Sequence, residues 1–147
     1  MPAPLCVPAC VTADEVLIPT YAHPGDAGLD LRATQGCVLE PFERALIPTG
    51  LCVAIPEGYA GLILPRSGLA IKQGFTLLNT PGLIDSNYRG ELKVIGINLD
   101  RKCSFTIAPN DRIAQLVIVR VEQAALALQT RLDETERGTG GFGSSGV

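Results

Sequence analysis

The apolar segments of this chain are short, and turn-forming residues bound them throughout. Short β-prone runs separated by Gly, Pro, Asn and Asp are typical of an all-β sandwich or barrel. The 16 glycines and 11 prolines agree with many turns and few long helices. We therefore predict an all-β domain with strands at residues 15–18, 37–40, 45–47, 51–55, 59–64, 75–78, 92–99, 105–107 and 113–121.

Helical signals are scarce. The best candidate is one short helix at residues 67–73, with Ser67 as its candidate N-cap and Gly74 as its stop. Residues 122–129 have a helix-prone composition, but the alternation of Ala124, Leu126 and Leu128 fits a strand equally well. Both interpretations of that segment stay open.

Length and charge narrow the class of protein. A chain of 147 residues makes one domain, and its net charge of −3 argues against a nucleic-acid binder that relies on positive charge. No apolar run reaches the roughly 18 residues of a membrane helix, and the first residues lack the basic region of a secretion signal. Charged residues make up 18%, against about 25% in typical domains, which suggests that another chain covers part of the surface.

The cysteines and the histidine predict neither a disulfide framework nor a metal centre. The five cysteines are an odd number and contain no Cys-x-x-Cys pair. We expect reduced thiols in a cytoplasmic protein, where they act as small hydrophobic side chains. A site rich in histidine is excluded because His23 is the single histidine.

Two segments carry candidate chemistry. Residues 79–92 form a turn-rich connection that offers Asn79, Asp85 and Tyr88 and can present backbone groups to a flat ligand, although Asp85 could equally be a simple turn former. Arg66 and Ser67 open the predicted helix, where free amides, a hydroxyl and a guanidinium suit an anion. The alternative there is a capped helix with a surface arginine.

Three further features need an explanation. Asp30 follows a glycine-containing turn, and Gln115 places a polar amide within the most apolar strand. Residues 138–146 are almost entirely Gly, Ser and Thr around Phe142, just after Arg137. Such a segment is a floppy terminus or a tail that orders over a ligand, and the single aromatic among glycines favours the tail.

Five runs in this order resemble one family. AGLDL, PRSGLA, NTPGLIDSNYRGEL, DRIAQL and RGTGGFGSSG are similar to the five motifs of the homotrimeric deoxyuridine triphosphatases (dUTPases), and the resemblance extends from about Val16 to Gly146. It implies a jelly-roll-like β-barrel with a flexible Gly/Ser-rich C-terminal tail, and a homotrimer with active sites at subunit interfaces. Within a single domain of residues 1–147, residues 1–13 are an N-terminal extension, and the tail at 132–147 closes over the active site.

The resemblance also implies an activity. The family hydrolyses dUTP to dUMP and pyrophosphate with Mg²⁺, which keeps uracil out of DNA and supplies dUMP for dTMP synthesis. Asp85 would be the general base for water attacking the α-phosphorus, with Gln115 as its catalytic partner in positioning phosphate or water. Asp30 would act on Mg²⁺ through water, while substrate phosphates hold most of the ion. The substrate would contact Arg66, Ser67, Gly68, Asn79, Gly82, Leu83, Ile84, Asp85, Tyr88, Lys93, Arg137, Phe142, Gly143 and Ser144.

The resemblance also assigns a role to each part of that set. Asn79 and the backbone at residues 83–85 would read uracil, and Tyr88 would pack under the sugar and exclude a ribose 2′-hydroxyl. Residues 66–68 would hold phosphates. The tail would close over the triphosphate, with Phe142 stacked on uracil.

Two rival functions remain. A dCTP deaminase shares the fold and the PRS-like and AQL-like segments, but that family calls for a glutamate base and a Trp-type hairpin, which residues 85–90 do not match. A non-catalytic interaction protein on a β scaffold would tolerate loss of Asp85 and of the tail. We expect no nucleic-acid partner and no membrane partner for this chain.

Overall fold

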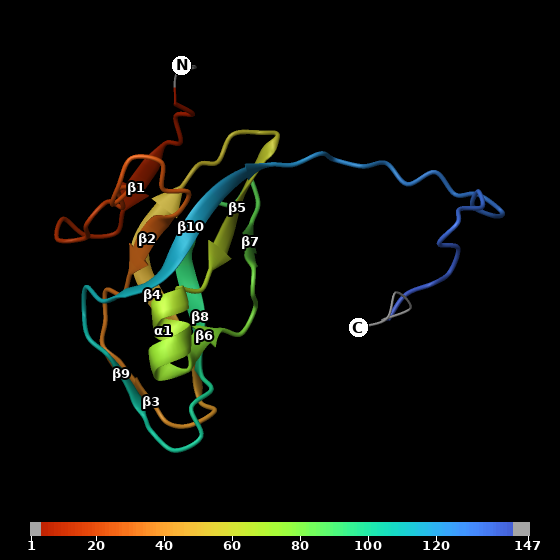
Figure 1. Cartoon of the computed structure of the whole chain (residues 1–147). Coiled ribbons are helices and arrows are strands. Elements are labelled where there is room, and N and C mark those ends of the chain that lie inside the picture. Colours follow the sequence, from red (N-terminus) through yellow and green to blue (C-terminus); the bar gives the residue numbers. More distant parts are fainter. Residues whose placement is uncertain (1–3, 143–147) are drawn as a thin grey trace.

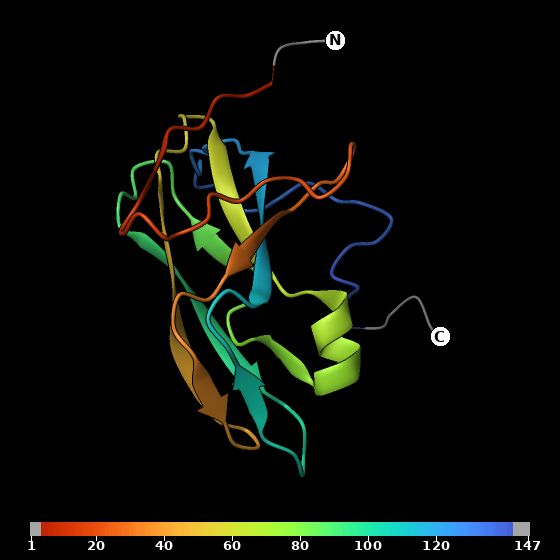
Figure 2. The ribbon, with the colours of Figure 1, turned by 90° about the vertical axis from the view of Figure 1, so that its left-hand side faces the viewer.

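The computed structural model describes residues 4–142 as two four-stranded antiparallel sheets with a smaller two-stranded sheet at one end (Figures 1 and 2). The elements in chain order are β1 (Ala9–Val11), β2 (Leu29–Arg32), β3 (Cys37–Leu39), β4 (Arg44–Val53), β5 (Tyr59–Leu64), α1 (Ser67–Gln73), β6 (Phe75–Leu77), β7 (Gly82–Ile84), β8 (Glu91–Asn98), β9 (Phe105–Ile107) and β10 (Arg112–Arg120). The all-β prediction is confirmed, and the arrangement is jelly-roll-like.

Strand pairing links segments that are far apart in the sequence. One sheet has the order β1-β4-β8-β6 and the other has the order β2-β10-β5-β7. Alternate side chains of both sheets point inward, so one apolar core forms between them. Its fully buried members include Leu31, Ile47, Phe75, Leu92 and Leu116.

Polar groups in that core are satisfied. The Asn98 amide donates to the carbonyl oxygens of Leu39 and Cys103 at 3.0 and 2.9 Å, and its own oxygen accepts from the Asp100 amide. Asn98 is completely buried, so these bonds remove the desolvation cost of its amide. They also tie the end of β8 to the loop that leads into β9.

The helix lies where the sequence predicts it, with one correction at its start. The N-cap residue is Arg66, whose side chain makes no capping hydrogen bond, and Ser67 is the first helical residue. The prediction of Ser67 as N-cap is therefore wrong. Gly74 does end the helix, in the left-handed conformation at φ 64° that glycine adopts without strain.

The strand predictions need four corrections. Residues 15–18 are not a strand, because a turn at residues 13–16 takes the chain off the sheet and leaves Leu17 and Ile18 exposed. The runs at 45–47 and 51–55 belong to one strand, β4, which crosses the Pro48–Gly50 region as an irregularity in register. Residues 122–129 form neither helix nor strand. The strands β1, β2 and β7 were not predicted, and β7 lies within the segment at residues 79–92 that the sequence indicated as a turn-rich connection.

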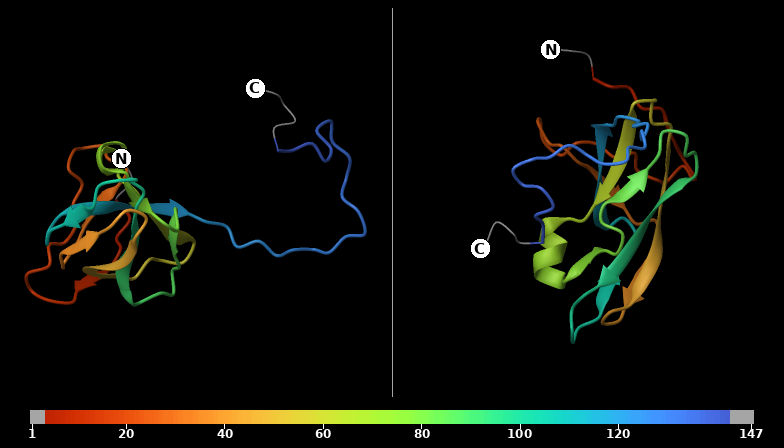
Figure 3. Two further views of the ribbon diagram at one scale, coloured as in Figure 1. Left: turned by 90° about the horizontal axis from the view of Figure 1, so that it is seen from below. Right: turned by 90° about the vertical axis from the view of Figure 1, so that its right-hand side faces the viewer.

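Beyond β10 the chain leaves the body of the molecule. Residues 121–142 run outward from the sheets, as Figure 1 and the left view of Figure 3 show. Leu126, Leu128 and Leu132 on this segment are 97%, 99% and 82% exposed. Among residues 4–142, no helix is long and apolar enough to cross a membrane.

Candidate active site

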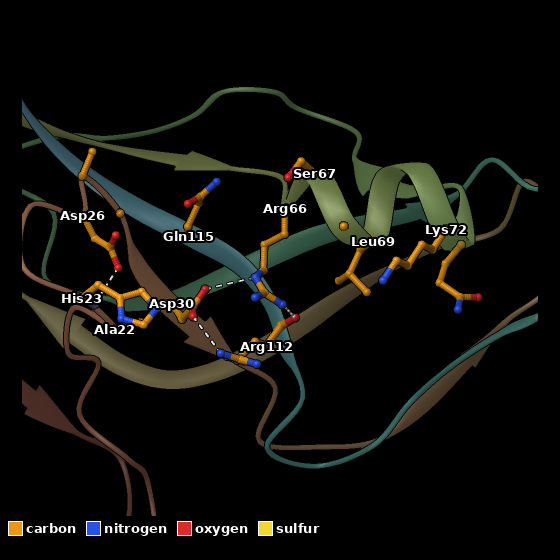
Figure 4. Close-up of a pocket in the computed structure, with 14 residues that line it drawn as sticks. Ala22, His23, Asp26, Asp30, Arg66, Ser67, Leu69, Lys72, Arg112 and Gln115 are labelled. Carbon is orange, nitrogen blue, oxygen red and sulfur yellow. Dashed lines mark hydrogen bonds and ion pairs between the residues drawn. The ribbon is translucent and has the colours of Figure 1, made fainter.

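A cavity of about 650 Å³ lies beside α1 (Figure 4). We call it the helix pocket. Four segments build it: the loop at residues 22–28, β2, the start of α1 and the start of β10. Its lining includes Asp30, Arg66, Ser67, Gly68 and Gln115, which are five of the sequence-predicted site residues.

An ion-pair network fixes the side chains at the centre of the helix pocket. Asp30 lies between two arginines, with its carboxylate 3.0 Å from Arg66 Nε and 3.5 Å from Arg112 Nη1 (Figure 4). Arg66 Nη1 also donates to the main-chain oxygen of Arg112 at 3.0 Å. Two guanidinium groups around one carboxylate leave positive charge over, so the centre of the pocket suits an anion.

Gln115 reaches the same pocket from β10, where its register partners are Asp30 on β2 and Leu64 on β5. Its Nε2 donates to the Pro65 oxygen at 3.0 Å, which leaves its carbonyl oxygen free to accept. Gly28 makes this position possible, because a Cβ at residue 28 would lie 2.6 Å from Gln115 Oε1. A Cβ at Gly68, in contrast, would meet nothing within 4 Å.

A second cavity, of about 320 Å³, lies against the connection between β7 and β8. We call it the hairpin pocket. Its lining includes Leu83, Ile84, Asp85, Tyr88 and Lys93, which are also sequence-predicted site residues.

Hydrogen bonds set the shape of this connection. The Tyr88 amide donates to the Asp85 oxygen at 3.1 Å, and the Tyr88 hydroxyl donates to the Glu91 oxygen at 3.0 Å. Glu91 in turn pairs with Lys93 at 3.5 Å and accepts from the Gly50 amide at 2.8 Å. The Asp85 side chain is exposed and accepts no hydrogen bond from residues 4–142.

Asn79 and Gly82 lie at the other end of the same connection. A Cβ at Gly82 would lie 3.4 Å from Asn79 Nδ2, so the two residues are neighbours. The structure therefore groups these hairpin residues on one segment, although Asn79 and Gly82 do not line the hairpin pocket.

The two pockets of one chain are separate. Strand β5 lies between β10 and β7 and therefore connects the two regions. Ile84 on β7 pairs with Gly61 on β5, whereas Arg66 lies just past the other end of β5. Five residues of extended chain span roughly 16 Å at about 3.3 Å per residue, and Asp85 lies one residue further away. No residue of the described range 4–142 lines both pockets. Asp85 and Arg66 of the same chain therefore do not form one compact site.

The predicted tail residues lie apart from both pockets. Arg137 bonds to the Gly140 oxygen at 2.9 Å within the tail, and Phe142 is fully exposed. Gly143 and Ser144 lie outside the described residues.

Several lining residues of the helix pocket escaped sequence analysis. Arg112 completes the ion-pair network, and His23, Asp26 and Lys72 also line the cavity. The His23 amide donates to the Asp26 carboxylate at 2.8 Å, which holds that loop at the mouth. The DRIAQL run contains Arg112 but does not show its pairing with Asp30. The loop at 22–28 shows no pattern that places it beside α1.

Comparison with known proteins follows the same motifs. The family model described as dUTPase matches residues 14–146. The chain belongs to the dUTPase family. Two relatives named deoxyuridine 5′-triphosphate nucleotidohydrolase are similar to this dUTPase-family chain. The Leifsonia xyli protein is 52% identical over 88% of this chain and 85% of its own length. The Streptomyces avermitilis protein is 51% identical over 98% of this chain and 82% of its own length.

Solved dUTPase structures agree with the fold. The Staphylococcus bacteriophage 80alpha dUTPase with dUpNHpp has a TM-score of 0.88 and 32% identity, with 97% of this chain and 99% of that chain covered. A mutant dUTPase from phage phi11 of S. aureus, described as coordinating a structural Mg(II) ion, has a TM-score of 0.80 and 27% identity over 88% of this chain and 100% of that chain.

Proposed function

We propose that this dUTPase-family chain hydrolyses dUTP to dUMP and pyrophosphate at a site shared between copies of the chain. The observation that supports a shared site is the separation of the two pockets within one chain. One chain offers a hairpin pocket with an exposed acid and a helix pocket with arginines, and Asp85 lies too far from Arg66 to act on a phosphate held there. A second copy that places its helix pocket against the hairpin completes the site, and a cyclic homotrimer repeats this contact three times.

The hairpin recognises the base and the sugar. Backbone groups at residues 83–85 and the amide of Asn79 hydrogen-bond the edge of uracil. Cytosine reverses a donor and an acceptor at that edge, and the resulting unpaired groups lower its turnover by up to roughly 10⁴-fold. Tyr88, held by its bond to the Glu91 oxygen, packs under the deoxyribose and leaves no room for a 2′-hydroxyl. Lys93 extends the same pocket on β8.

Asp85 acts as the general base. Its exposed carboxylate takes a proton from water as the water oxygen attacks the α-phosphorus, and the bond from that phosphorus to the bridging oxygen of pyrophosphate breaks. A carboxylate that is free of partners within the described part of its own chain is available for that proton. Positioning and charge stabilisation supply most of the rate in such phosphoryl substitutions.

The helix pocket holds the phosphates. Arg66, Ser67 and Gly68 contact phosphate oxygens, and the open space at Gly68 lets the backbone approach them closely. Gln115 offers its free carbonyl oxygen to the attacking water or stays near the α-phosphate. The network around Asp30 keeps Arg66 extended toward the anion before substrate binds.

The donor set fits Mg²⁺ bound mainly through the substrate. Residues 4–142 contain no group of three His, Cys, Asp or Glu side chains that could hold a metal ion by themselves. Mg²⁺ favours one or two carboxylates together with phosphates and waters, and Asp30 supplies such a carboxylate through water. When bound, the ion neutralises charge on the triphosphate.

The tail completes the site. Its exposed, extended course lets Arg137 reach a triphosphate and Phe142 stack on uracil, and Gly143 and Ser144 would follow along the phosphates. Closure excludes water and commits the substrate. The odd number of cysteines supports a cytoplasmic location for this chemistry.

A substrate panel tests the reaction. The protein is incubated with dUTP, dCTP, dTTP or UTP and Mg²⁺, and pyrophosphate and ammonia are assayed. We expect pyrophosphate from dUTP and little from the other three. Ammonia from dCTP would support the deaminase instead, and no turnover of any nucleotide would support the interaction protein.

Mixed assemblies test the shared site. Asp85→Asn and Arg66→Ala each remove one half, so each variant alone should be almost inactive when dUTP is kept well below KM. Co-refolded in equal amounts, they should recover about a quarter of wild-type activity, because random assortment gives that share of intact sites. Light scattering should give the mass of a trimer. No recovery, or an active monomer, would contradict a site shared between copies.

A further inference from the structure

Two cysteines stand directly opposite each other on neighbouring strands. β1 pairs with β4 in antiparallel register, with Cys10 facing Cys52. Both are free thiols; Cys10 is exposed, and Cys52 is half-buried. β1 belongs to the N-terminal segment that precedes the dUTPase match, so the activity does not account for this pair.

The backbone register brings the two α-carbons within reach of a disulfide. The Thr12 amide donates to the Gly50 oxygen and the Ala54 amide donates to the Pro8 oxygen, both at 2.8 Å. Hydrogen-bonded pairs alternate along an antiparallel ladder, which makes Cys10 and Cys52 a hydrogen-bonded pair with α-carbons roughly 5.5 Å apart. Disulfides usually join α-carbons about 4.4–6.8 Å apart.

The surroundings of Cys52 favour its protonated form. Burial first, and then the neighbouring Cys10 thiol and the charge of Glu91, raise the pKa of Cys52. Cys52 therefore keeps its proton more readily than a free cysteine, and the exposed Cys10 is the accessible thiol for a first attack.

We propose that Cys10 and Cys52 form a reversible intrachain disulfide that locks the N-terminal strand onto β4. The oxidant is a low-molecular-weight disulfide such as glutathione disulfide. The Cys10 thiolate attacks one sulfur of the oxidant and releases one thiol, which leaves a mixed disulfide on Cys10. Cys52 then loses its proton and attacks the Cys10 sulfur, and a second thiol leaves. The two cysteines lose two electrons and two protons, and the oxidant becomes two thiols.

The bond would brace the edge of the sheet beside the hairpin. β1 is a three-residue edge strand, and β4 continues the sheet to β8, where Cys52 is paired in register with Glu91. Closing a loop of about 40 residues restricts the unfolded chain, so we expect the Tm to rise by about 5 °C. The helix pocket takes no residue from β1 or β4, and Leu46, the β4 residue that lines the hairpin pocket, lies six positions from Cys52. We therefore expect dUTP turnover to change less than about twofold.

Alkylation followed by mass spectrometry identifies the disulfide between Cys10 and Cys52. Full-length protein is equilibrated with glutathione disulfide, alkylated, digested with trypsin and analysed by mass spectrometry without reduction. We expect residues 1–32 linked to residues 45–66, three alkylated cysteines per chain, and full reversal by dithiothreitol. Cys6→Ser should form the same link, because Cys6 lies on the same peptide but outside the pair. Cys103→Ser serves as the control, because Cys103 lies in the loop between β8 and β9 and outside both linked peptides.

Substitution of either cysteine should abolish the disulfide. Cys10→Ser and Cys52→Ser should each lose both the link and the Tm rise while they keep dUTP turnover. A link that survives Cys10→Ser but disappears in Cys6→Ser would overturn the assignment. Stable glutathione adducts on Cys10, or covalent dimers on a non-reducing gel, would overturn it as well.

Discussion

The helix pocket and the hairpin pocket differ in how their functional side chains are held. In the helix pocket, Asp30, Arg66 and Arg112 satisfy one another, and Gln115 is fixed by the Pro65 oxygen. The hairpin pocket leaves Asp85 without a partner among residues 4–142 and exposes apolar surface, with Leu46 and Leu83 at 60% and 63%. One chain alone organises the helix pocket, whereas the exposed apolar surface of the hairpin pocket suits contact with a second chain.

Because of this difference, we expect substitutions in the two pockets to change different kinetic constants. In the proposed mechanism, the helix pocket binds the triphosphate in both the substrate and the transition state, so we expect losses there mainly to raise KM. In the same mechanism, Asp85 takes a proton only in the transition state, so we expect its loss to lower kcat. Four experiments separate these expectations.

The largest effect is expected at Asp85. Asp85→Asn keeps the size of the side chain but removes the base, so kcat should fall by at least about 10²-fold, while the affinity for a non-hydrolysable dUTP analogue stays within a few-fold. Steady-state kinetics and calorimetry measure the two quantities. Asn87→Ala, on the same turn, is the control and should retain activity. Full activity of Asp85→Asn would remove this residue from the chemistry.

The tail should come next. Deletion of residues 138–147 removes Phe142 and the glycine-rich stretch, but it removes no residue of the described core. We expect an unchanged Tm, a trimer by light scattering and a loss of about 10²-fold in kcat/KM, because the site stays open to water. Phe142→Ala should lose less than the deletion does. Normal turnover by the truncated chain would show that no lid is needed.

Arg112 tests whether organisation within the helix pocket matters. Arg112→Ala takes one partner from Asp30 and leaves Arg66 paired with that carboxylate alone. We expect KM for dUTP to rise by about tenfold with a smaller change in kcat. Arg112→Lys should recover part of the loss, because lysine restores the charge but not the planar fork. Arg101→Ala, an exposed arginine on the loop after β8, is the control, and an equal effect there would reduce the role of Arg112 to general charge.

The sequence predicted the local chemistry better than the arrangement. Short apolar runs gave most strands because side-chain alternation and turn residues act over a few positions. Ser67 was wrong as N-cap because that choice depends on backbone angles at residue 66. Residues 15–18 were wrong because a strand needs a neighbouring edge to pair with, which composition cannot supply.

The candidate site divides in the same way. Asp30, Arg66 and Gln115, which three separate motifs supplied as candidates, lie together in the helix pocket. Arg112 was missed because its role arises from a pairing between β10 and β2 that joins positions about 80 residues apart in the chain. The distance between the two pockets likewise follows from the register of β5 and β7, and no single motif contains it.

The smallest and most specific effects are expected from two glycines, one in each pocket. Gly28→Ala places a Cβ 2.6 Å from Gln115 Oε1, and Gly90→Ala places one against the Tyr88 hydroxyl and ring. We expect Gly28→Ala to lower kcat/KM for dUTP by about threefold to tenfold without changing the ratio of dUTP to UTP turnover, because Gln115 does not contact the sugar. Gly90→Ala should lower that ratio by a similar factor, because the displaced Tyr88 ring no longer crowds the 2′ position. Parallel assays with both nucleotides measure the ratio. If the two variants change it equally, the division between a phosphate-binding and a sugar-selecting pocket is wrong.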